Sequence, residues 1–253
     1  ETTVYGLSVV VENSSPTVSN VSVTPDPPTQ SDLLTCDYTL DDLDAGDTAT
    51  AEIEWTVNGA AVGNFVQASP GNYHSCALTS SGEAICWGWD TDGQCSPPEG
   101  TFIDITTSLA HTCAINTEGE AVCWGSDDQG ESSPPPGPLT TISAGWHHTC
   151  GLDPEGQAVC WGWTKYGQST PPGTGTYTAI SSGWVHTCAI NTQGEAVCWG
   201  DDSDGQSSPP AGPFTSITAD GYHSFAFNTK GEAVCWGGDY AGEATPPANF
   251  PNP

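Results

Sequence analysis

Basic residues are almost absent from this chain of 253 residues. Lysine occurs only at Lys165 and Lys230 and arginine not at all, whereas aspartate and glutamate total 31, which gives a net charge of −29. A surface with this charge repels phosphate groups, so binding to nucleic acid or to an anionic membrane is excluded. No run of about 18 apolar residues is present, which excludes a membrane-spanning helix. The chain starts at Glu1 without a signal peptide, as expected of a chain that has already been processed.

Recognised catalytic patterns are missing as well. The sequence has no G-x-S-x-G, no H-E-x-x-H and no isolated cysteine–histidine pair. We therefore expect no enzymatic activity and no cofactor. Three acidic loops, at residues 41–47, 90–93 and 201–205, partly resemble calcium-binding loops, but the last two lack the distal glutamate of an EF-hand. A solvated turn is the favoured interpretation of these loops, and calcium binding is the alternative.

The chain contains five similar copies of one short sequence. The copy from His111 reads HTCAINTEGEAVCWG, and the first histidines of the copies are 37, 37, 38 and 37 residues apart. Each copy reads as a strand, a hairpin, a Gly-Gln or Gly-Glu loop and a Pro-Pro corner, and such a period is typical of a propeller or solenoid. Both faces of the hairpin are apolar, as a sheet between two other sheets requires. We predict an all-β fold in which residues 64–253 form a five-bladed β-propeller.

Paired cysteines accompany four of the copies. The two cysteines of a pair lie ten residues apart, around a turn with glycine where a three-residue hairpin loop needs a positive φ. This register places their Cβ atoms about 4.5–5.5 Å apart, within reach of a disulfide. The predicted disulfides are Cys76–Cys86, Cys113–Cys123, Cys150–Cys160 and Cys188–Cys198. Zinc is the rival interpretation, but C-x9-C lacks the short spacing of zinc ligands. Disulfides indicate a secreted or surface-exposed protein.

Three cysteines have no partner within a copy: Cys36, Cys95 and Cys235. The last of these faces Phe225, which stands where the other copies have their first cysteine. An odd number of cysteines in a secreted chain predicts a buried thiol or a bond between chains.

The first 63 residues lack the repeat. Residues 1–12 alternate apolar and polar side chains and predict a strand, followed by a linker to residue 15. The apolar face of this strand comprises Tyr5, Leu7, Val9 and Val11. Residues 16–63 carry strand signals separated by proline-rich and acidic turns. These signals lie at residues 18–23, 33–38 and 51–57.

Both regions resemble known families. The succession G-x-x-H-T-x-A, G-x-x-x-x-W-G and G-Q, repeated from residue 64 onward, resembles the repeat of the regulator of chromosome condensation family of β-propellers, and the short cysteine-containing version is similar to bacterial secreted members. The resemblance implies a propeller, usually of seven blades, whereas five copies occur here. The family's chromatin-binding role requires a basic surface and is not implied. Residues 16–63, with Cys36 and Trp55, resemble the first half of a bacterial immunoglobulin-like domain, which implies a truncated β-sandwich.

Aromatic residues outside the repeated positions are the candidate ligand-binding residues. The repeated histidines and tryptophans are explained by a structural hydrogen bond and by packing between blades. Other aromatic residues fall in loops, where exposed rings suit stacking on sugars or on a protein partner. The candidates are Trp89, Trp146, Trp163 and Trp184, accompanied by Tyr166, Tyr222 and Tyr240.

These observations predict an extracellular structural protein, a subunit of a surface fibre or filament that associates with identical subunits by strand addition. An apolar strand at residues 1–12 is an aggregation hazard unless it is covered. We therefore expect it to point away from its own half-sandwich and to pair with that of a neighbouring subunit. We also expect the five blades to close into one compact toroid, with Cys235 unpaired in its own blade. The alternative is a monomeric secreted binding module, an adhesin or a protein- or carbohydrate-binding propeller, that uses the loop aromatics.

Overall fold

The computed structural model describes residues 5–11, 17–24, 35–41, 51–57, 60–62 and 65–246. The chain divides into two compact units, Glu1–Asn64 and Phe65–Pro253. Every regular element of the described residues is a β-strand, which confirms the all-β prediction. No helix long and apolar enough to cross a membrane occurs within these described ranges.

The first unit contains two antiparallel sheets, one in the order β1-β4-β5 and one that pairs β2 with β3. The strands are β1 (Tyr5–Val11), β2 (Thr17–Thr24), β3 (Thr35–Asp41), β4 (Ala51–Val57) and β5 (Ala60–Val62). The four strands predicted from the sequence are therefore present, and β5 is an addition. The immunoglobulin-like sandwich stays a prediction, and the side chain of Cys36 lies outside the described residues.

The prediction that the first strand points away from its own unit is wrong. Strand β1 pairs with β4 of the same chain, with Leu7 opposite Trp55 and Val9 opposite Ile53. A partner strand on the same chain is present at a much higher effective concentration than one on another molecule. The alternating pattern of residues 1–12 thus identified a strand correctly but could not identify its partner.

The second unit consists of five three-stranded antiparallel sheets, each built from consecutive strands. The sheets are β6 (Phe65–Pro70), β7 (His74–Thr79) and β8 (Ala84–Gly88); β9 (Phe102–Thr107), β10 (His111–Asn116) and β11 (Ala121–Gly125); β12 (Thr141–Ala144), β13 (His148–Leu152) and β14 (Ala158–Gly162); β15 (Tyr177–Ser182), β16 (His186–Asn191) and β17 (Ala196–Gly200); and β18 (Phe214–Asp220), β19 (His223–Asn228) and β20 (Ala233–Gly237). One sheet corresponds to one sequence repeat.

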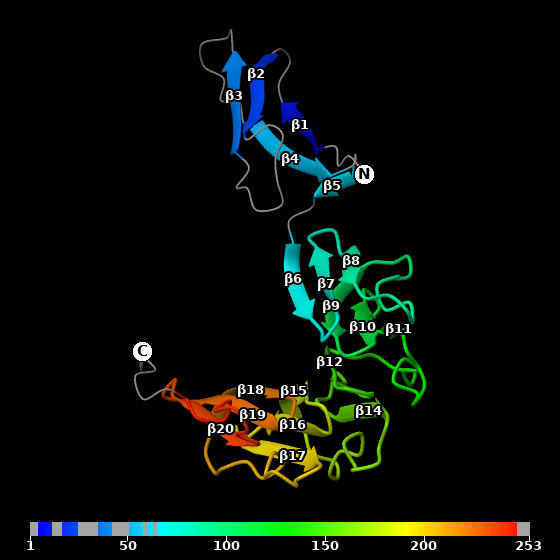
Figure 1. Ribbon diagram of the computed structural model, residues 1–253, viewed down its shortest axis with the longest axis vertical. Helices are drawn as coiled ribbons and strands as arrows, with labels where there is room; N and C mark the ends of the chain where they lie inside the picture. The colour runs from blue at the N-terminus through cyan, green and yellow to red at the C-terminus, as the bar shows by residue number, and fades with distance from the viewer. Residues whose placement is uncertain are drawn as a thin grey trace. The chain divides into compact units, whose positions relative to one another are not determined.

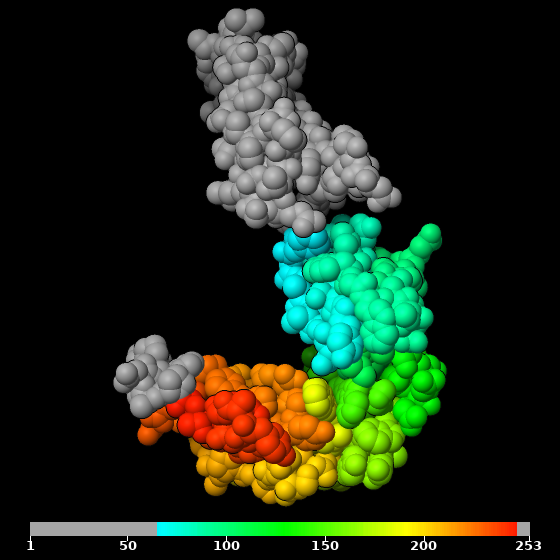
Figure 2. Space-filling model, in the orientation of Figure 1, coloured from blue at the N-terminus to red at the C-terminus, as the bar shows by residue number. Residues whose placement is uncertain are grey.

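Within this unit the sheets follow one another along an open arc (Figure 1). The first strands of consecutive sheets are neighbours, from β6 to β9, β12, β15 and β18. The sheet β6–β8 and the sheet β18–β20 lie at opposite ends of the arc, as the cyan and the orange-red surfaces of Figure 2 show. The predicted closed toroid is therefore wrong. Packing between neighbours sets the step from sheet to sheet, and the four steps between the five sheets cover only part of a circle.

The hairpin within each sheet has the geometry that the glycine pattern predicts. In the first sheet the amide of Thr79 donates to the carbonyl of Glu83 at 3.0 Å, and Gly82 has φ of 82°. A Cβ atom on Gly82 would lie 2.9 Å from the carbonyl oxygen of Phe102, so glycine is required by space as well as by conformation. This turn fixes the register that places Cys76 opposite Cys86.

The hydrophobic core is divided into clusters between consecutive sheets. The cluster between the first and second sheets includes Leu78, Phe102, Ile105 and Trp124, and all four side chains are buried. Equivalent clusters fill the next three interfaces. Each repeat therefore depends on its neighbours for burial, which is the energetic signature of a repeat array.

Candidate functional site

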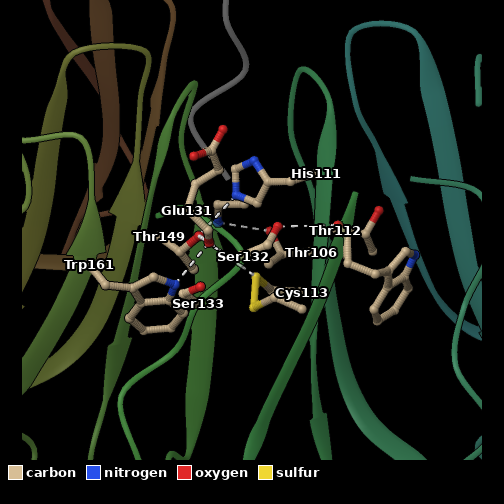
Figure 3. Close-up of a disulfide and its surroundings, with 12 residues drawn as sticks. Thr106, His111, Thr112, Cys113, Glu131, Ser132, Ser133, Thr149 and Trp161 are labelled. Atoms are coloured by element: carbon tan, nitrogen blue, oxygen red, sulfur yellow. Dashed lines mark hydrogen bonds between the residues drawn. A yellow bond between two sulfur atoms is a disulfide. The ribbon is translucent and has the colours of Figure 1, made fainter. Parts of the chain in front are cut away.

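The repeated tryptophans tie each sheet to the sheet before it. The indole Nε1 of Trp161 donates to the carbonyl of Glu131 at 2.9 Å, and Figure 3 shows both beside the Cys113 disulfide. The same bond recurs from Trp124, Trp199 and Trp236, at 2.8 to 3.0 Å. These four indoles are 7–8 % exposed. The prediction of packing between blades is confirmed for them.

Trp87 of the first repeat differs, because it is 51 % exposed. No preceding repeat offers it a carbonyl within the described part of the chain. The same residue type in the same repeat position is therefore exposed at this end of the arc and buried elsewhere.

The repeated histidines make the predicted structural hydrogen bond. Nε2 of His111 lies 2.9 Å from Oγ1 of Thr149, whose hydroxyl in turn donates to the carbonyl of Glu131 at 3.2 Å. Because the hydroxyl has one hydrogen, the imidazole must donate through Nε2–H, which leaves Nδ1 as the bare acceptor. The buried Nδ1 of His111 accordingly has no partner.

Burial keeps these histidines neutral. It lowers the pKa of His111 from 6.5 to about 4, that of His148 to about 3 and that of His186 to about 4. His74 and His186 make the equivalent bonds to the next repeat, at 2.7 and 2.8 Å. The side chains belong to the interfaces between sheets and do not converge on a common ligand.

All four predicted disulfides are present, with S–S distances of 2.02–2.11 Å. Cys95 and Cys235 are free thiols. Cys235 lies opposite Phe225 in the β19–β20 pair, which confirms that it is unpaired in its own sheet.

A continuous row of aromatic rings lies at one end of the sheets, and we call it the aromatic row. It consists of Trp146, His147, Trp163, Tyr166, Trp184, Tyr222 and Tyr240. Ring-centroid distances between successive neighbours are 5.2–6.4 Å, so every member contacts at least one other. The contact between Trp146 and Trp184 at 5.4 Å joins the third repeat to the fourth.

The row is built at equivalent corners of the sheets. Trp146 and Trp184 each stand two residues before the repeated histidine, at the corner between the first and second strands. Trp163 follows the last strand of its sheet, and its amide donates to the carbonyl of His147 at 2.7 Å. Three of the four predicted tryptophans are thus brought together. Trp89 lies apart and makes an edge-to-face pair with Tyr73 at 5.3 Å.

One hydrogen-bonded pair supports the middle of the row. Nδ1–H of His147 donates to the buried carboxylate of Glu131 at 3.3 Å, and the imidazole stacks on Trp146. Burial opposes ionisation of Glu131, but hydrogen bonds from His147, backbone amides and Ser126 outweigh it and lower its pKa to about 2. At neutral pH the row therefore has an ionised carboxylate beneath its centre.

Sequence reasoning missed His147 and Glu131. His147 breaks the repeat, because the third copy doubles its histidine. Glu131 stands where three other copies have Gln94, Gln168 and Gln206 and the fifth has Glu243. The doubled histidine was the signal that could have found His147, whereas a glutamate that recurs in the fifth copy gave no such signal.

The acidic loops have structural roles within the described residues. Asp90 Oδ1 accepts the amide of Cys95 at 2.7 Å, and Asp202 Oδ1 accepts that of Ser207 at 2.9 Å. No group of three or more histidine, cysteine or acidic side chains that could hold a metal ion occurs in the described ranges. The loop at residues 41–47 lies outside them, apart from the backbone of Asp41.

A hollow adjoins the aromatic row. It has a volume of about 290 Å³ and is lined by the corners that follow β6, β9, β12 and β15, together with Asp220 at the end of β18. Trp146 and Trp184 belong both to its lining and to the row. Glycine is required at two of these corners, since a Cβ atom on Gly71 or Gly145 would lie 2.3 or 2.4 Å from a carbonyl oxygen of the next corner.

Fold and site together define an open array of propeller blades with repeated, interlocking interfaces and a non-repeated aromatic row. Residues 65–94, 102–131, 139–168 and 177–206 match the regulator of chromosome condensation (RCC1) repeat. The second unit is therefore an RCC1-type β-propeller array. No curated protein matches the sequence.

Solved structures with the same fold include proteins from a plant and from yeast. The ectodomain of the receptor kinase CR4 from Physcomitrella patens has a TM-score of 0.62 and 23 % identity, over 74 % of this chain and 56 % of that one. Prp20p from Saccharomyces cerevisiae has a TM-score of 0.60 and 18 % identity, over 68 % of this chain and 58 % of that one. The chain thus spans less than two thirds of either structure, and the likeness concerns the fold alone.

Proposed function

We propose that this protein is an extracellular binding module and that the aromatic row is its ligand-binding surface. The observation that carries the proposal is that the row is contiguous but not repeated. The fold requires one buried tryptophan per interface, and Trp161 supplies it in the third repeat. Trp163, Trp146 and Trp184 are additional and remain partly exposed. Contiguous aromatic surface that folding does not require is typical of binding sites.

The surroundings of the row restrict its ligand. Of the two basic residues of the chain, Lys165 lies over Tyr166, with Nζ 5.1 Å from the ring centroid. Asp204 accepts a hydrogen bond from the hydroxyl of Tyr240 at 2.6 Å. With a chain charge of −29, the row suits a neutral or basic partner and disfavours an anionic one. The disulfides support an extracellular location for this encounter.

A binding screen tests the proposal. The full chain is presented by surface plasmon resonance to neutral polysaccharides, acidic polysaccharides and a basic protein. Trp163→Ala and Trp184→Ala are the test variants, and Trp87→Ala is the matched control because Trp87 is exposed but outside the row. We expect a neutral or basic polymer to bind and each row variant to weaken it about tenfold, the size of one aromatic contact. The absence of binding, or an equal loss in Trp87→Ala, contradicts the proposal.

Self-association into a fibre is the second candidate function, and the position of β1 favours it. In the order β1-β4-β5, β1 is an edge strand and pairs on one side only among the described strands. Such an edge is a template for a strand of another molecule. Light scattering of the full chain tests this: assembly predicts a mass that rises with protein concentration, and a constant monomeric mass contradicts it.

A further inference from the structure

We propose that the hollow beside the aromatic row is a binding site for one unit of a neutral carbohydrate chain. The inference rests on the proposed function of the row and assigns a ligand class to it. The hollow and the row share Trp146 and Trp184, so a chain bound on the row continues into the hollow.

The size and shape of the hollow suit a single sugar unit. Ligand pockets commonly measure about 300–1,000 Å³, and this one, at about 290 Å³, is at the lower end. At Gly71 and Gly145 the hollow is lined by main chain, because there is no room for a side chain at either position. The small residues of the corners and the indoles of Trp146 and Trp184 give the lining both polar and flat apolar groups, which a sugar ring requires.

Polar side chains line the hollow along its length, and Asn72 and Asp220 belong to its first and last corners. Asn72 of the first corner is exposed, and no hydrogen bond occupies its side-chain amide within the described residues. Asp220, at the other end of the lining, is exposed and accepts only the amide of Gly221, at 2.8 Å. An amide and a carboxylate supply both the donor and the acceptors that sugar hydroxyls need.

The charge of the hollow decides between sugars and other ligands. Asp220 is the single charged residue of the lining, so a cationic peptide finds one carboxylate and no second partner. The hollow contains no lysine, and an acidic sugar therefore meets repulsion without compensation. A hydroxyl-rich, uncharged ligand with one apolar face matches all of the lining groups.

Trp146 carries a further sign of ligand binding. Its Nε1 is buried and has no hydrogen-bond partner. An unpaired buried donor costs about 1–3 kcal/mol, and in a native structure it calls for an explanation other than stability. The ring of Trp146 lies 5.4 Å from that of Trp184, and both rings line the hollow.

Titration with defined oligosaccharides tests the site. The full chain is titrated calorimetrically with cellotetraose, maltotetraose, mannotetraose and chitotetraose, and also with tetragalacturonate and tetralysine. Trp184→Ala and Asn72→Ala change the hollow, whereas the control Trp87→Ala removes an exposed indole outside both the hollow and the row. Trp184→Phe keeps an aromatic ring, and thermal unfolding of each variant verifies its fold.

We expect at least one of the four neutral tetrasaccharides to bind. Trp184→Ala should weaken it about tenfold and Asn72→Ala a few-fold, with Trp184→Phe between them and Trp87→Ala unchanged. Binding of tetragalacturonate or tetralysine alone overturns the inference, as does neutral binding that is insensitive to Trp184→Ala. If no tetrasaccharide binds while the row variants still weaken a protein partner in the earlier screen, this inference fails and the proposed function stands. If neither experiment shows binding, both fail.

Discussion

Tryptophan is used both in the interfaces between sheets and in the aromatic row. It is buried and repeated in the interfaces, whereas in the row it is partly exposed and not repeated. Trp161 recurs in every repeat, is 8 % exposed and donates to the main chain of the preceding repeat. Trp163, two residues later, has no counterpart in three of the other repeats, and its ring contacts His147 and Tyr166 of the row. Repetition therefore separates residues that the array needs for folding from residues that are free to serve another purpose.

The largest expected effect is a loss of stability at acid pH, which arises from the histidines in the interfaces between sheets. Burial lowers the pKa of His111 to about 4, of His148 to about 3 and of His186 to about 4, from 6.5. The unfolded chain binds these protons first, so stability is complete above pH 6.5 and falls as the pH decreases towards 4. Each histidine contributes about 3 kcal/mol to this loss. Urea unfolding at pH 7.5, 5.5 and 4.5 measures it.

Glu131 affects the stability only at a lower pH than the histidines do. Its pKa is depressed to about 2, so its contribution is complete above its ordinary value of 4.5 and is lost only below that. Glu131→Gln should therefore leave the slope between pH 7.5 and 4.5 unchanged, whereas His148→Gln should flatten it. Equal unfolding free energies at pH 7.5 and 4.5 for the unaltered chain would count against the buried neutral histidines.

The next effect compares one repeated position at two places in the arc. Trp124→Ala should reduce the free energy of unfolding by about 3–5 kcal/mol, because it leaves a cavity and removes one of the two hydrogen bonds to the carbonyl of Gln94. Trp87→Ala should cost under about 1 kcal/mol, since Trp87 is 51 % exposed. Urea unfolding of both variants provides the measurement. Similar losses would mean that Trp87 is also covered in solution.

Much of the fold and of the aromatic row could be predicted from the sequence, but not all of it. The separation of ten residues around a glycine turn determines the hairpin register, so the disulfides followed from local geometry. The pairing of β1 with β4 and the exposure of Trp87 depend on which elements meet, and no local pattern contains that information. The sequence identified Trp163 and Trp184 as non-repeated aromatics. Their union into one row required the third and fourth sheets to be placed side by side.

A smaller effect is expected in the last sheet, which lacks the disulfide of the other four. Phe225 lies opposite Cys235, as Cys188 lies opposite Cys198. Phe225→Cys should therefore form a fifth disulfide, worth about 2.5–3 kcal/mol by the chain-entropy estimate. Loss of the contact between Phe225 and Phe227, at 4.8 Å, reduces the net gain to about 1–2 kcal/mol. Mass spectrometry without reductant should show the loss of two hydrogens, and Phe225→Ser is the control that cannot cross-link. A free thiol at both positions would refute the equivalence of the last sheet with the others.

The claim that repeated residues hold the fold while the row is free for binding is tested most directly within the third repeat. Trp161→Ala and Trp163→Ala remove the same side chain two residues apart, and their unfolding free energies can be compared in urea at pH 7.5. The account predicts a loss of about 3–5 kcal/mol for Trp161→Ala and under about 1 kcal/mol for Trp163→Ala. A loss for Trp163→Ala as large as that for Trp161→Ala would contradict it, because the row would then be part of the folding core.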